Sequence, residues 1–320
     1  MKIVLLERNS AGTDISVDCF SEFGEVVSYA NTVTPTEVSE RVGDADIVVC
    51  NKSPMRADTL EDCPNVKLIC ELATGYDNCD LEYCKSRGIQ VRNVVDYSTS
   101  MVAQHTFTLA LALSQKLIHY DAYVKCGAYG AQDRFSNFDR PFYELDGKTW
   151  GIVGMGNIGK RVAKIATAFG CKVIFTSITG KSTVTEYEQV SKNELLERSD
   201  FLSLHCPLSD LSRDYIDLYA LRAMKKTAYL INVARGPVVN NPDLYDALRL
   251  GEIAGAGLDV LEKEPIQPTN PLAKIQDSSK LIITPHLAWA SVEARTRCVQ
   301  GVYDNIAAFL RGEDRNVVNP

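Results

Sequence analysis

The chain has 320 residues, of which 45% are hydrophobic and 23% are charged, and its formal net charge at pH 7 is −7. This length allows two domains with cores of their own, and the acidic balance disfavours a general nucleic-acid binder or a protein held on a membrane surface. The N-terminus reaches Glu7 after a short apolar run, which is typical of a first strand and not of a signal peptide. No apolar run approaches a membrane span, so we expect a cytoplasmic globular protein.

The ten cysteines and four histidines are scattered along the chain. No C-x-x-C pair occurs, and Cys50, Cys70 and Cys206 lie inside apolar runs, which favours free thiols in a reducing cytoplasm over disulfides. The histidines form no pair at metal-ligand spacing: they are His105, His119, His205 and His286. We therefore predict no metal site.

Residues 1–97 alternate between short apolar runs and more polar segments. The strand-like runs are residues 3–6, 26–28, 47–50, 68–70 and 89–92, and helical or turn segments lie between them, as at 36–42 and 81–86. Such alternation predicts a parallel sheet with helices on both faces. This part has no glycine-rich phosphate turn, so it need not bind a nucleotide.

Residues 98–123 form a long segment whose apolar residues surround a helix instead of forming a stripe, which predicts one buried helix. We expect this helix to connect two domains and to pack at a subunit contact. Residues 124–147 are rich in Gly, Asp, Arg and aromatic residues, and they predict an ordered loop that lies on a surface.

The apolar run 150–153 leads into Gly154-Met155-Gly156-Asn157-Ile158-Gly159, and a segment of helical period follows. In a dinucleotide site, Gly154 makes the tight turn, Gly156 lets the backbone approach a pyrophosphate, and Gly159 allows the helix to pack closely on the strand. The N-terminus of that helix offers N–H groups and a favourable dipole to phosphates. The alternative is an ordinary strand–helix turn, but the position between a strand and a helix favours the dinucleotide site.

From Thr149 onward the alternation resumes as a second series. Strands are predicted at 150–153, 172–176, 201–204, 228–232, 255–258 and 281–284, and helices near 157–169, 192–197, 218–224 and 241–250. This pattern is typical of a doubly wound dinucleotide-binding domain, and an amphipathic helix at 292–310 is expected to return to the first domain. We therefore predict two Rossmann-like α/β domains with parallel sheets, in which a dinucleotide-binding domain (99–288) is inserted into a discontinuous substrate domain (1–98 and 289–320).

Arg235, Glu264 and His286 each follow a predicted strand, and ligands of open α/β sheets bind at the carboxyl ends of strands. Their chemistry fits hydride transfer to a keto acid. An arginine can hold a carboxylate bidentately, a histidine can give a proton to the developing alkoxide, and a carboxylate beside the imidazole stabilises its protonated form. Singly, each is better explained as a surface arginine, a solvated acid or a loop histidine, but together on one sheet edge after a dinucleotide turn they indicate an active site.

A series of motifs stands in one order along the chain: Asn51-Lys-Ser-Pro, Ala73-Thr-Gly-Tyr-Asp, Tyr97-Ser-Thr-Ser-Met-Val-Ala-Gln, Gly154-Met-Gly-Asn-Ile-Gly, His205-Cys-Pro-Leu, Asn232-Val-Ala-Arg-Gly, Leu258-Asp-Val with Glu264-Pro, and Thr284-Pro-His-Leu-Ala-Trp. With these motifs the sequence resembles the D-isomer-specific 2-hydroxyacid dehydrogenase family, and within it the glycerate dehydrogenase and hydroxypyruvate reductase branch, over nearly the whole chain. The resemblance implies that Arg235 binds and polarises the substrate, that His286 is the acid/base, and that Glu264 is its partner.

The resemblance also implies substrate contacts in the first domain. The backbone N–H groups of Thr74 and Gly75 would hold the substrate carboxylate. Lys52 would lie near the substrate, unless it is a plain surface lysine. Aromatic residues would line the pocket or, alternatively, belong to the core, and they are Trp289, Phe138 and Phe142.

For the cofactor, the resemblance implies that Asp259, His286 and the backbone around Val233 face the nicotinamide, and that the Cys206-Pro207 turn borders the adenosine. It further implies a homodimer, formed through the long helix near 99–123 and the loop that follows it.

One departure from the family bears on the cofactor. Where NAD-specific members end the second strand of the domain in an aspartate, this chain has Ser177. Serine removes the charge that repels a 2′-phosphate, and Ser177, Thr179 and Lys181 could bind one. This favours NADP(H) over NAD(H), with the alternative that Ser177 accepts both. A second departure is Val95-Asp96, where relatives often carry Pro-Gly.

The resemblance therefore implies NAD(P)H-dependent reduction of hydroxypyruvate or glyoxylate to D-glycerate or glycolate. The alternatives are a nicotinamide-sensing protein of the corepressor kind, which shares the fold, and a dehydrogenase of the D-lactate or phosphoglycerate type. Oxidation of NADPH or NADH in the presence of hydroxypyruvate separates the enzyme from the binding protein.

Overall fold

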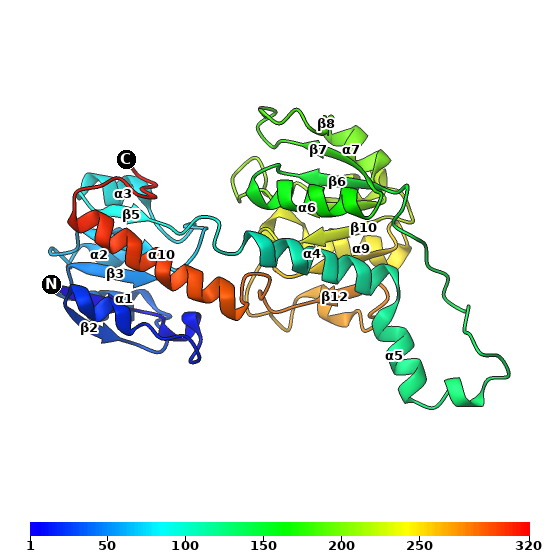
Figure 1. The fold of residues 1–320 in the computed structure, drawn as a ribbon, viewed down its shortest axis with the longest axis horizontal. Helices are drawn as coiled ribbons and strands as arrows, with labels where there is room; N and C mark the ends of the chain where they lie inside the picture. Colours follow the sequence, from blue (N-terminus) through cyan, green and yellow to red (C-terminus); the bar gives the residue numbers. More distant parts are fainter. The chain divides into compact units, whose positions relative to one another are not determined.

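The computed structural model describes residues 1–320 and has an α/β organisation throughout (Figure 1). The chain divides into two compact units. Unit 1 comprises Met1–Ser98 and Ala290–Pro320, and unit 2 comprises Thr99–Trp289, so that unit 2 is an insertion in the sequence of unit 1. None of the helices is both long enough and apolar enough to cross a membrane.

Unit 1 is built on a sheet of five parallel strands in the order β2-β1-β3-β4-β5. The strands are β1 (Lys2–Leu5), β2 (Glu25–Ser28), β3 (Ile47–Cys50), β4 (Leu68–Glu71) and β5 (Gln90–Arg92). Every residue of β3 and β4 is buried, as expected for the inner strands of a parallel sheet that is covered on both faces. The strand predictions for residues 1–97 are confirmed to within one residue at each end.

The helices of unit 1 are α1 (Pro35–Val42), α2 (Ala57–Leu60), α3 (Leu81–Ser86) and α10 (Val292–Leu310), with the 3-10 turns η1 (Arg8–Ala11) and η2 (Asp18–Phe23). Helix α10, predicted at the same residues, packs against β4. Gly301 makes room in this helix for a neighbour, since a Cβ there would lie 2.4 Å from Val94 Cγ1. The segment after α10 then reaches the sheet, where the Val318 N–H donates to the Val91 carbonyl at 2.9 Å.

Unit 2 contains a sheet of seven parallel strands in the order β12-β11-β10-β9-β6-β7-β8. The strands are β6 (Thr149–Val153), β7 (Lys172–Thr176), β8 (Glu188–Gln189), β9 (Phe201–Leu204), β10 (Tyr229–Asn232), β11 (Gly255–Leu258) and β12 (Leu281–Ile283). The sequence predicts all of these except the short edge strand β8. The winding reverses at β6, which lies between β7 and β9, and such a reversal is where doubly wound sheets bind ligands.

The helices of unit 2 are α4 (Thr99–Ser114), α5 (Leu117–Lys125), α6 (Asn157–Ala168), α7 (Lys192–Arg198), α8 (Leu218–Ala223) and α9 (Asn241–Leu250), with the 3-10 turns η3 (Tyr129–Ala131), η4 (Gly236–Val238) and η5 (Pro271–Lys274). The prediction of one continuous helix near 99–123 is wrong, because Lys116 takes a left-handed conformation with a φ of 56° between α4 and α5. The Lys116 ammonium donates to the Tyr229 hydroxyl at 2.9 Å and to the Ser279 carbonyl at 3.2 Å. These bonds hold the chain where the helix breaks.

Helix α4 packs on β10, β11 and α6 (Figure 1). Its close approach to β11 depends on Gly257, since a Cβ there would lie 2.9 Å from Leu109 Cβ and 3.2 Å from Leu113 Cδ1. His105 is one helical turn before Leu109 and therefore shares its face of α4. Because Leu109 packs on Gly257, His105 lies near the residues that follow β11.

Candidate active site

The turn between β6 and α6 has the geometry of a dinucleotide-binding turn. Gly154 has a φ of 93°, and a Cβ there would lie 2.9 Å from backbone atoms of His205 and Cys206, so this contact with the end of β9 needs a glycine. At Gly159, a Cβ would lie 2.2 Å from the Gly154 carbonyl oxygen. Gly156, the N-cap of α6, has nothing within 4 Å of a Cβ, which leaves the helix N-terminus open to a phosphate. These residues fit a bound dinucleotide.

The remaining predicted cofactor residues in this part of unit 2 lie at the same sheet edge. Ser177 follows β7 in a tight turn, in which the Gly180 N–H donates to the Ser177 carbonyl at 3.0 Å and Ser177 Oγ donates to the Lys181 carbonyl at 2.9 Å. The Thr179 hydroxyl lies 3.2 Å from the Ser177 hydroxyl. Cys206, after β9, is buried, whereas Pro207 is exposed.

Arg235 lies in a loop after β10 that Asn232 fixes from within. The Asn232 side chain accepts from the Ala234 N–H at 3.0 Å and donates to the Arg235 carbonyl at 2.9 Å. Gly236 then lies against the neighbouring loop, since a Cβ there would be 1.9 Å from the Leu261 carbonyl. The loop of Arg235 therefore packs directly on the segment that leads from β11 to Glu264.

Glu264 and His286 form a side-chain pair, with 2.6 Å between Glu264 Oε2 and His286 Nδ1. The other carboxylate oxygen, Oε1, accepts from the Leu261 N–H at 2.9 Å. Because an ionised carboxylate only accepts hydrogen bonds, His286 Nδ1 carries a proton, and Nε2 is the ring atom left for proton exchange. The two side chains are 24% and 32% exposed, His286 and Glu264 respectively, so a small molecule can reach the pair.

Asp259 organises the loop that carries His286. Its carboxylate is buried and accepts from the Thr284 hydroxyl at 2.6 Å and from the N–H groups of Leu287 and Ala288 at 2.9 and 2.8 Å. Burial alone would raise the pKa of the Asp259 carboxyl, but its hydrogen bonds, to His105 first, outweigh burial and hold that pKa below its usual range. The buried group is therefore a carboxylate.

The order of the strands assembles these loops along one edge. His286 follows β12, Asp259 and Glu264 follow β11, and Arg235 follows β10, and these three strands are neighbours in the sheet. Val233, the first residue after β10, is buried in the same loop as Arg235. The edge thus places an arginine, a carboxylate and an imidazole after neighbouring strands, and only β9 separates β10 from β6 and its phosphate turn.

The predicted substrate residues of unit 1 lie in two short loops with internal support. The N–H groups of Asn51, Lys52 and Ser53 all donate to the buried Glu7 carboxylate, at 2.7 to 3.1 Å. In the second loop, Asn93 Nδ2 donates to the Thr74 carbonyl at 2.6 Å, and Thr74 Oγ1 donates to the Val94 carbonyl at 2.8 Å; Gly75 comes next and is partly exposed. Glu7 and Asn93 were not predicted, since nothing in the sequence marks a lone acid or amide as the support of a distant loop.

Glu71, at the end of β4, is a buried carboxyl that the sequence also does not reveal. Its Oε1 accepts from Asn78 Nδ2 at 2.9 Å and from the thiols of Cys79 and Cys50 at 3.0 and 3.2 Å, while Oε2 has no hydrogen-bond partner. Burial raises the pKa of Glu71 to about 7. All ten cysteines of the chain are free thiols.

The aromatic residues predicted beside the substrate differ in their surroundings. Phe138 and Phe142 belong to the loop after α5 and are 72% and 49% exposed in the single chain. Trp289, at the end of unit 2, is partly buried. Val95 is exposed, and Asp96 beside it has a left-handed φ of 61°, which suits the glycine that relatives often carry there.

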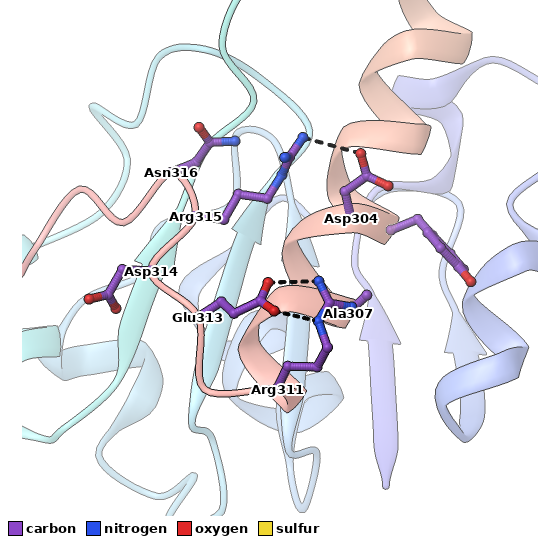
Figure 2. A pocket seen from close by; sticks show the side chains of 8 residues that line it. Asp304, Ala307, Arg311, Glu313, Asp314, Arg315 and Asn316 are labelled. Carbon is purple, nitrogen blue, oxygen red and sulfur yellow. Dashed lines mark hydrogen bonds and ion pairs between the residues drawn. The ribbon is translucent and has the colours of Figure 1, made fainter.

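A polar hollow of about 630 Å³ lies on unit 1, and none of the residues that line it is a predicted site residue (Figure 2). Four of the charged residues that line it form two ion pairs, Arg315 with Asp304 and Arg311 with Glu313. The residues that line it are Tyr303, Asp304, Ala307, Arg311, Glu313, Asp314, Arg315 and Asn316. We therefore do not assign the chemistry to this hollow.

The sequence of residues 107–288 matches the model of the D-isomer specific 2-hydroxyacid dehydrogenase, NAD binding domain. The chain is 39% identical to the glycerate dehydrogenase of Methylorubrum extorquens, an alignment that covers 99% of this chain and 98% of the relative. It is 38% identical to the hydroxypyruvate reductase of Blautia hydrogenotrophica over the full length of both.

Among solved structures, the fold is similar to that of the NADPH-dependent glyoxylate/hydroxypyruvate reductase of Sinorhizobium meliloti, in complex with NADP and malonate. The TM-score is 0.85 at 27% identity, and the match covers 99% of this chain and 96% of that one. The two parallel-sheet α/β units, the dinucleotide turn and the extent of these matches agree. The chain belongs to the D-isomer-specific 2-hydroxyacid dehydrogenase family and is an oxidoreductase that uses a nicotinamide cofactor.

Proposed function

We propose that this protein reduces a small 2-oxo acid, hydroxypyruvate or glyoxylate, to D-glycerate or glycolate. The observation that carries the proposal is the Glu264–His286 pair at 2.6 Å, set on the strands next to the loop of Arg235. The relatives named glycerate dehydrogenase and hydroxypyruvate reductase support this choice of substrate.

The residues at this edge of unit 2 would hold a nicotinamide dinucleotide, which when bound would supply a hydride for the C2 carbonyl carbon of the substrate. The turn from Gly154 to Gly159 would hold its pyrophosphate and the Cys206-Pro207 turn would border its adenosine. Val233 and Asp259, the residues that follow β10 and β11, would face its nicotinamide.

Arg235 binds the substrate carboxylate and polarises the carbonyl oxygen, because its guanidinium presents paired N–H donors. The N–H groups of Thr74 and Gly75, with Lys52, bind the substrate from unit 1, which we assign as the substrate domain.

As negative charge develops on the carbonyl oxygen, His286 donates the proton of Nε2 to it, and the alcohol forms. Glu264 stabilises the protonated imidazole and fixes the orientation of its ring through Nδ1. After the transfer, His286 takes a proton from solvent, so each turnover consumes one hydride and one proton.

We further propose a preference for NADP(H). The position after β7 carries Ser177, whose hydroxyl does not repel a 2′-phosphate, and the exposed Lys181 is in the same turn. The NADP-bound neighbour from Sinorhizobium meliloti supports this choice.

We also propose that two copies of the chain form a dimer through α5 and the loop that follows it, in a cytoplasm that keeps the thiols reduced. None of the residues of α5 is buried. Large apolar residues of α5 and the loop are exposed in the single chain, and they are Leu117, Ile118, Val124, Tyr129, Phe135, Phe138, Phe142 and Tyr143. A patch of this kind marks a contact with another protein surface.

The test is a panel of 2-oxo acids, run with purified protein and each reduced cofactor in turn, with absorbance at 340 nm as the readout. We expect turnover with hydroxypyruvate and glyoxylate, and a higher kcat/KM with NADPH than with NADH. Binding of a reduced cofactor without turnover of any 2-oxo acid would instead support the nicotinamide-sensing alternative. A clear preference for pyruvate would identify a D-lactate type of enzyme.

A further inference from the structure

His105 is a buried histidine of α4 that the proposed chemistry does not use. Its side chain is 6% exposed, and its Nε2 lies 2.9 Å from Thr284 Oγ1 and 3.4 Å from Asp259 Oδ1. It therefore reaches from the helix to the network that holds the loop of His286.

The hydrogen bonds around Thr284 fix which ring nitrogen of His105 carries a proton. The Thr284 hydroxyl has a single proton, which it donates to Asp259 Oδ1 at 2.6 Å, because a carboxylate can only accept. Thr284 Oγ1 can then only accept from His105, so the proton is on Nε2. The two oxygens nearest to this N–H, Thr284 Oγ1 and Asp259 Oδ1, both accept, and the His105 ring is their common donor.

The same network determines the backbone of His286. The His286 N–H donates to the Asp259 carbonyl at 2.8 Å, and the Asp259 carboxylate accepts from the two N–H groups that follow, those of Leu287 and Ala288. His286 itself has a left-handed φ of 54°, which is unfavourable for a residue with a Cβ and persists only where its surroundings impose it.

We propose that His105 is a positioning residue for the reaction: by donating its Nε2–H to Thr284 and Asp259, it holds the loop of 284–288 in the conformation that aims His286 at the substrate. This role rests on the proposed function of His286. His105 acts through a helix that Gly257 allows to approach β11, and we assign it no contact of its own with substrate or cofactor.

Three substitutions separate positioning from packing. In His105→Gln the amide nitrogen can reach the place of Nε2, in His105→Asn the shorter side chain cannot, and His105→Leu keeps the bulk but has no donor. We expect kcat to fall by about tenfold or more in the Asn and Leu variants, with the KM for the 2-oxo acid and the Kd for the reduced cofactor little changed, and kcat to be largely restored in the Gln variant.

A measurement without turnover accompanies the kinetics. In the protein labelled with ¹⁵N-histidine, the four ring systems are assigned by substitution, and the ¹⁵N shifts of His105 should show the Nε2–H form. An Nδ1–H form, or a loss of kcat that is equal in all three variants and follows their melting temperatures, would overturn the positioning role.

The His286→Gln variant tests the proposed function separately from the role of His105. Full turnover in His286→Gln, or no turnover in the wild-type protein, would overturn the proposed function itself. If His286→Gln is inactive while His105→Leu retains the wild-type kcat, only the role of His105 falls.

Discussion

Glu264 Oε2 and His286 Nδ1 lie 2.6 Å apart, although the two residues stand on loops that follow different strands. A backbone hydrogen bond holds the Glu264 carboxylate in place, since Glu264 Oε1 accepts from the Leu261 N–H. One carboxylate thus connects a fixed backbone to a ring that can exchange protons.

Replacement of Glu264 by glutamine should lower kcat by roughly 10- to 100-fold, because the protonated imidazole loses its opposite charge while the shape of the side chain is kept. Steady-state kinetics with saturating reduced cofactor measures the effect. The neighbouring exposed residue Glu262 provides the control, and Glu262→Gln should keep the wild-type rate. Equal rates in the two variants would remove Glu264 from the mechanism.

Substitution of Arg235 by lysine should be almost as damaging as substitution by alanine. A lysine keeps the positive charge but not the planar pair of N–H donors that a carboxylate accepts, so we expect kcat/KM for the 2-oxo acid to fall by about 100-fold or more in both variants. Circular dichroism should show the fold retained. Arg222→Lys, on the exposed face of α8, is the matched control. Near-normal kcat/KM in Arg235→Lys would mean that charge alone suffices.

Glu71 should make the stability of the protein depend on pH. The unfolded carboxyl titrates near 4.5 and the folded one at about 7, so the folded chain binds this proton more tightly. Its contribution, about 3 kcal/mol, is fully present below about pH 4.5 and is lost as the pH rises through about 7. Glu71→Gln should remove this dependence. The difference in unfolding free energy between the variant and the wild-type protein, measured by urea denaturation, should therefore favour the variant more at pH 8.5 than at pH 5.

The exposed Glu40 serves as the control for that comparison. Glu40→Gln should leave the pH dependence of the unfolding free energy as it is in the wild-type protein. If Glu71→Gln behaves in the same way, the buried carboxyl is not the group that titrates.

An aspartate at position 177 should shift the cofactor preference. Its charge repels a 2′-phosphate and can accept from the ribose hydroxyls of NAD(H), so we expect the ratio of kcat/KM for NADPH to that for NADH to fall by about tenfold or more in Ser177→Asp. Thr13→Asp adds the same charge at an exposed position of unit 1 and should leave the ratio unchanged. An unaltered ratio in Ser177→Asp would place the selection of the cofactor elsewhere.

Charged or small residues on the exposed apolar patch should separate the proposed dimer. Leu117 and Phe138 are 61% and 72% exposed in the single chain, and the double variant Leu117→Asp/Phe138→Ser should sediment as a monomer at concentrations where the wild-type protein is a dimer. Tyr219→Ser, at a still more exposed position of α8, should remain dimeric. A wild-type monomer at micromolar concentration would refute the dimer.

The sequence predicts much of this fold because each inner strand is a short apolar run bounded by turn residues, as at Ile47–Cys50 and Phe201–Leu204. The resemblance to the family also names Arg235, Glu264 and His286 in advance, and the family and the type of enzyme are confirmed. The roles of these three residues stay predictions.

What the sequence does not reveal depends on contacts between distant residues. The break at Lys116 lies within a continuous helical pattern, and the bond that its side chain makes there is to Tyr229, more than a hundred positions away. His105 lies among apolar residues of α4 like any core histidine, and only the fold brings it to Thr284. Glu71 ends an apolar strand, where nothing local shows that its carboxyl is buried.

The order of strands at the carboxyl edge separates the residue proposed to select the cofactor from the residues proposed to react with the substrate. Ser177 follows β7 and the reacting groups follow β10, β11 and β12, so that, at the usual spacing of neighbouring strands, roughly 20 Å of sheet lies between β7 and β11. Changes at sites so far apart combine almost independently. An ancestor of this chain could therefore exchange one electron carrier for another without disturbing the acid that protonates the product, and a protein engineer can do the same.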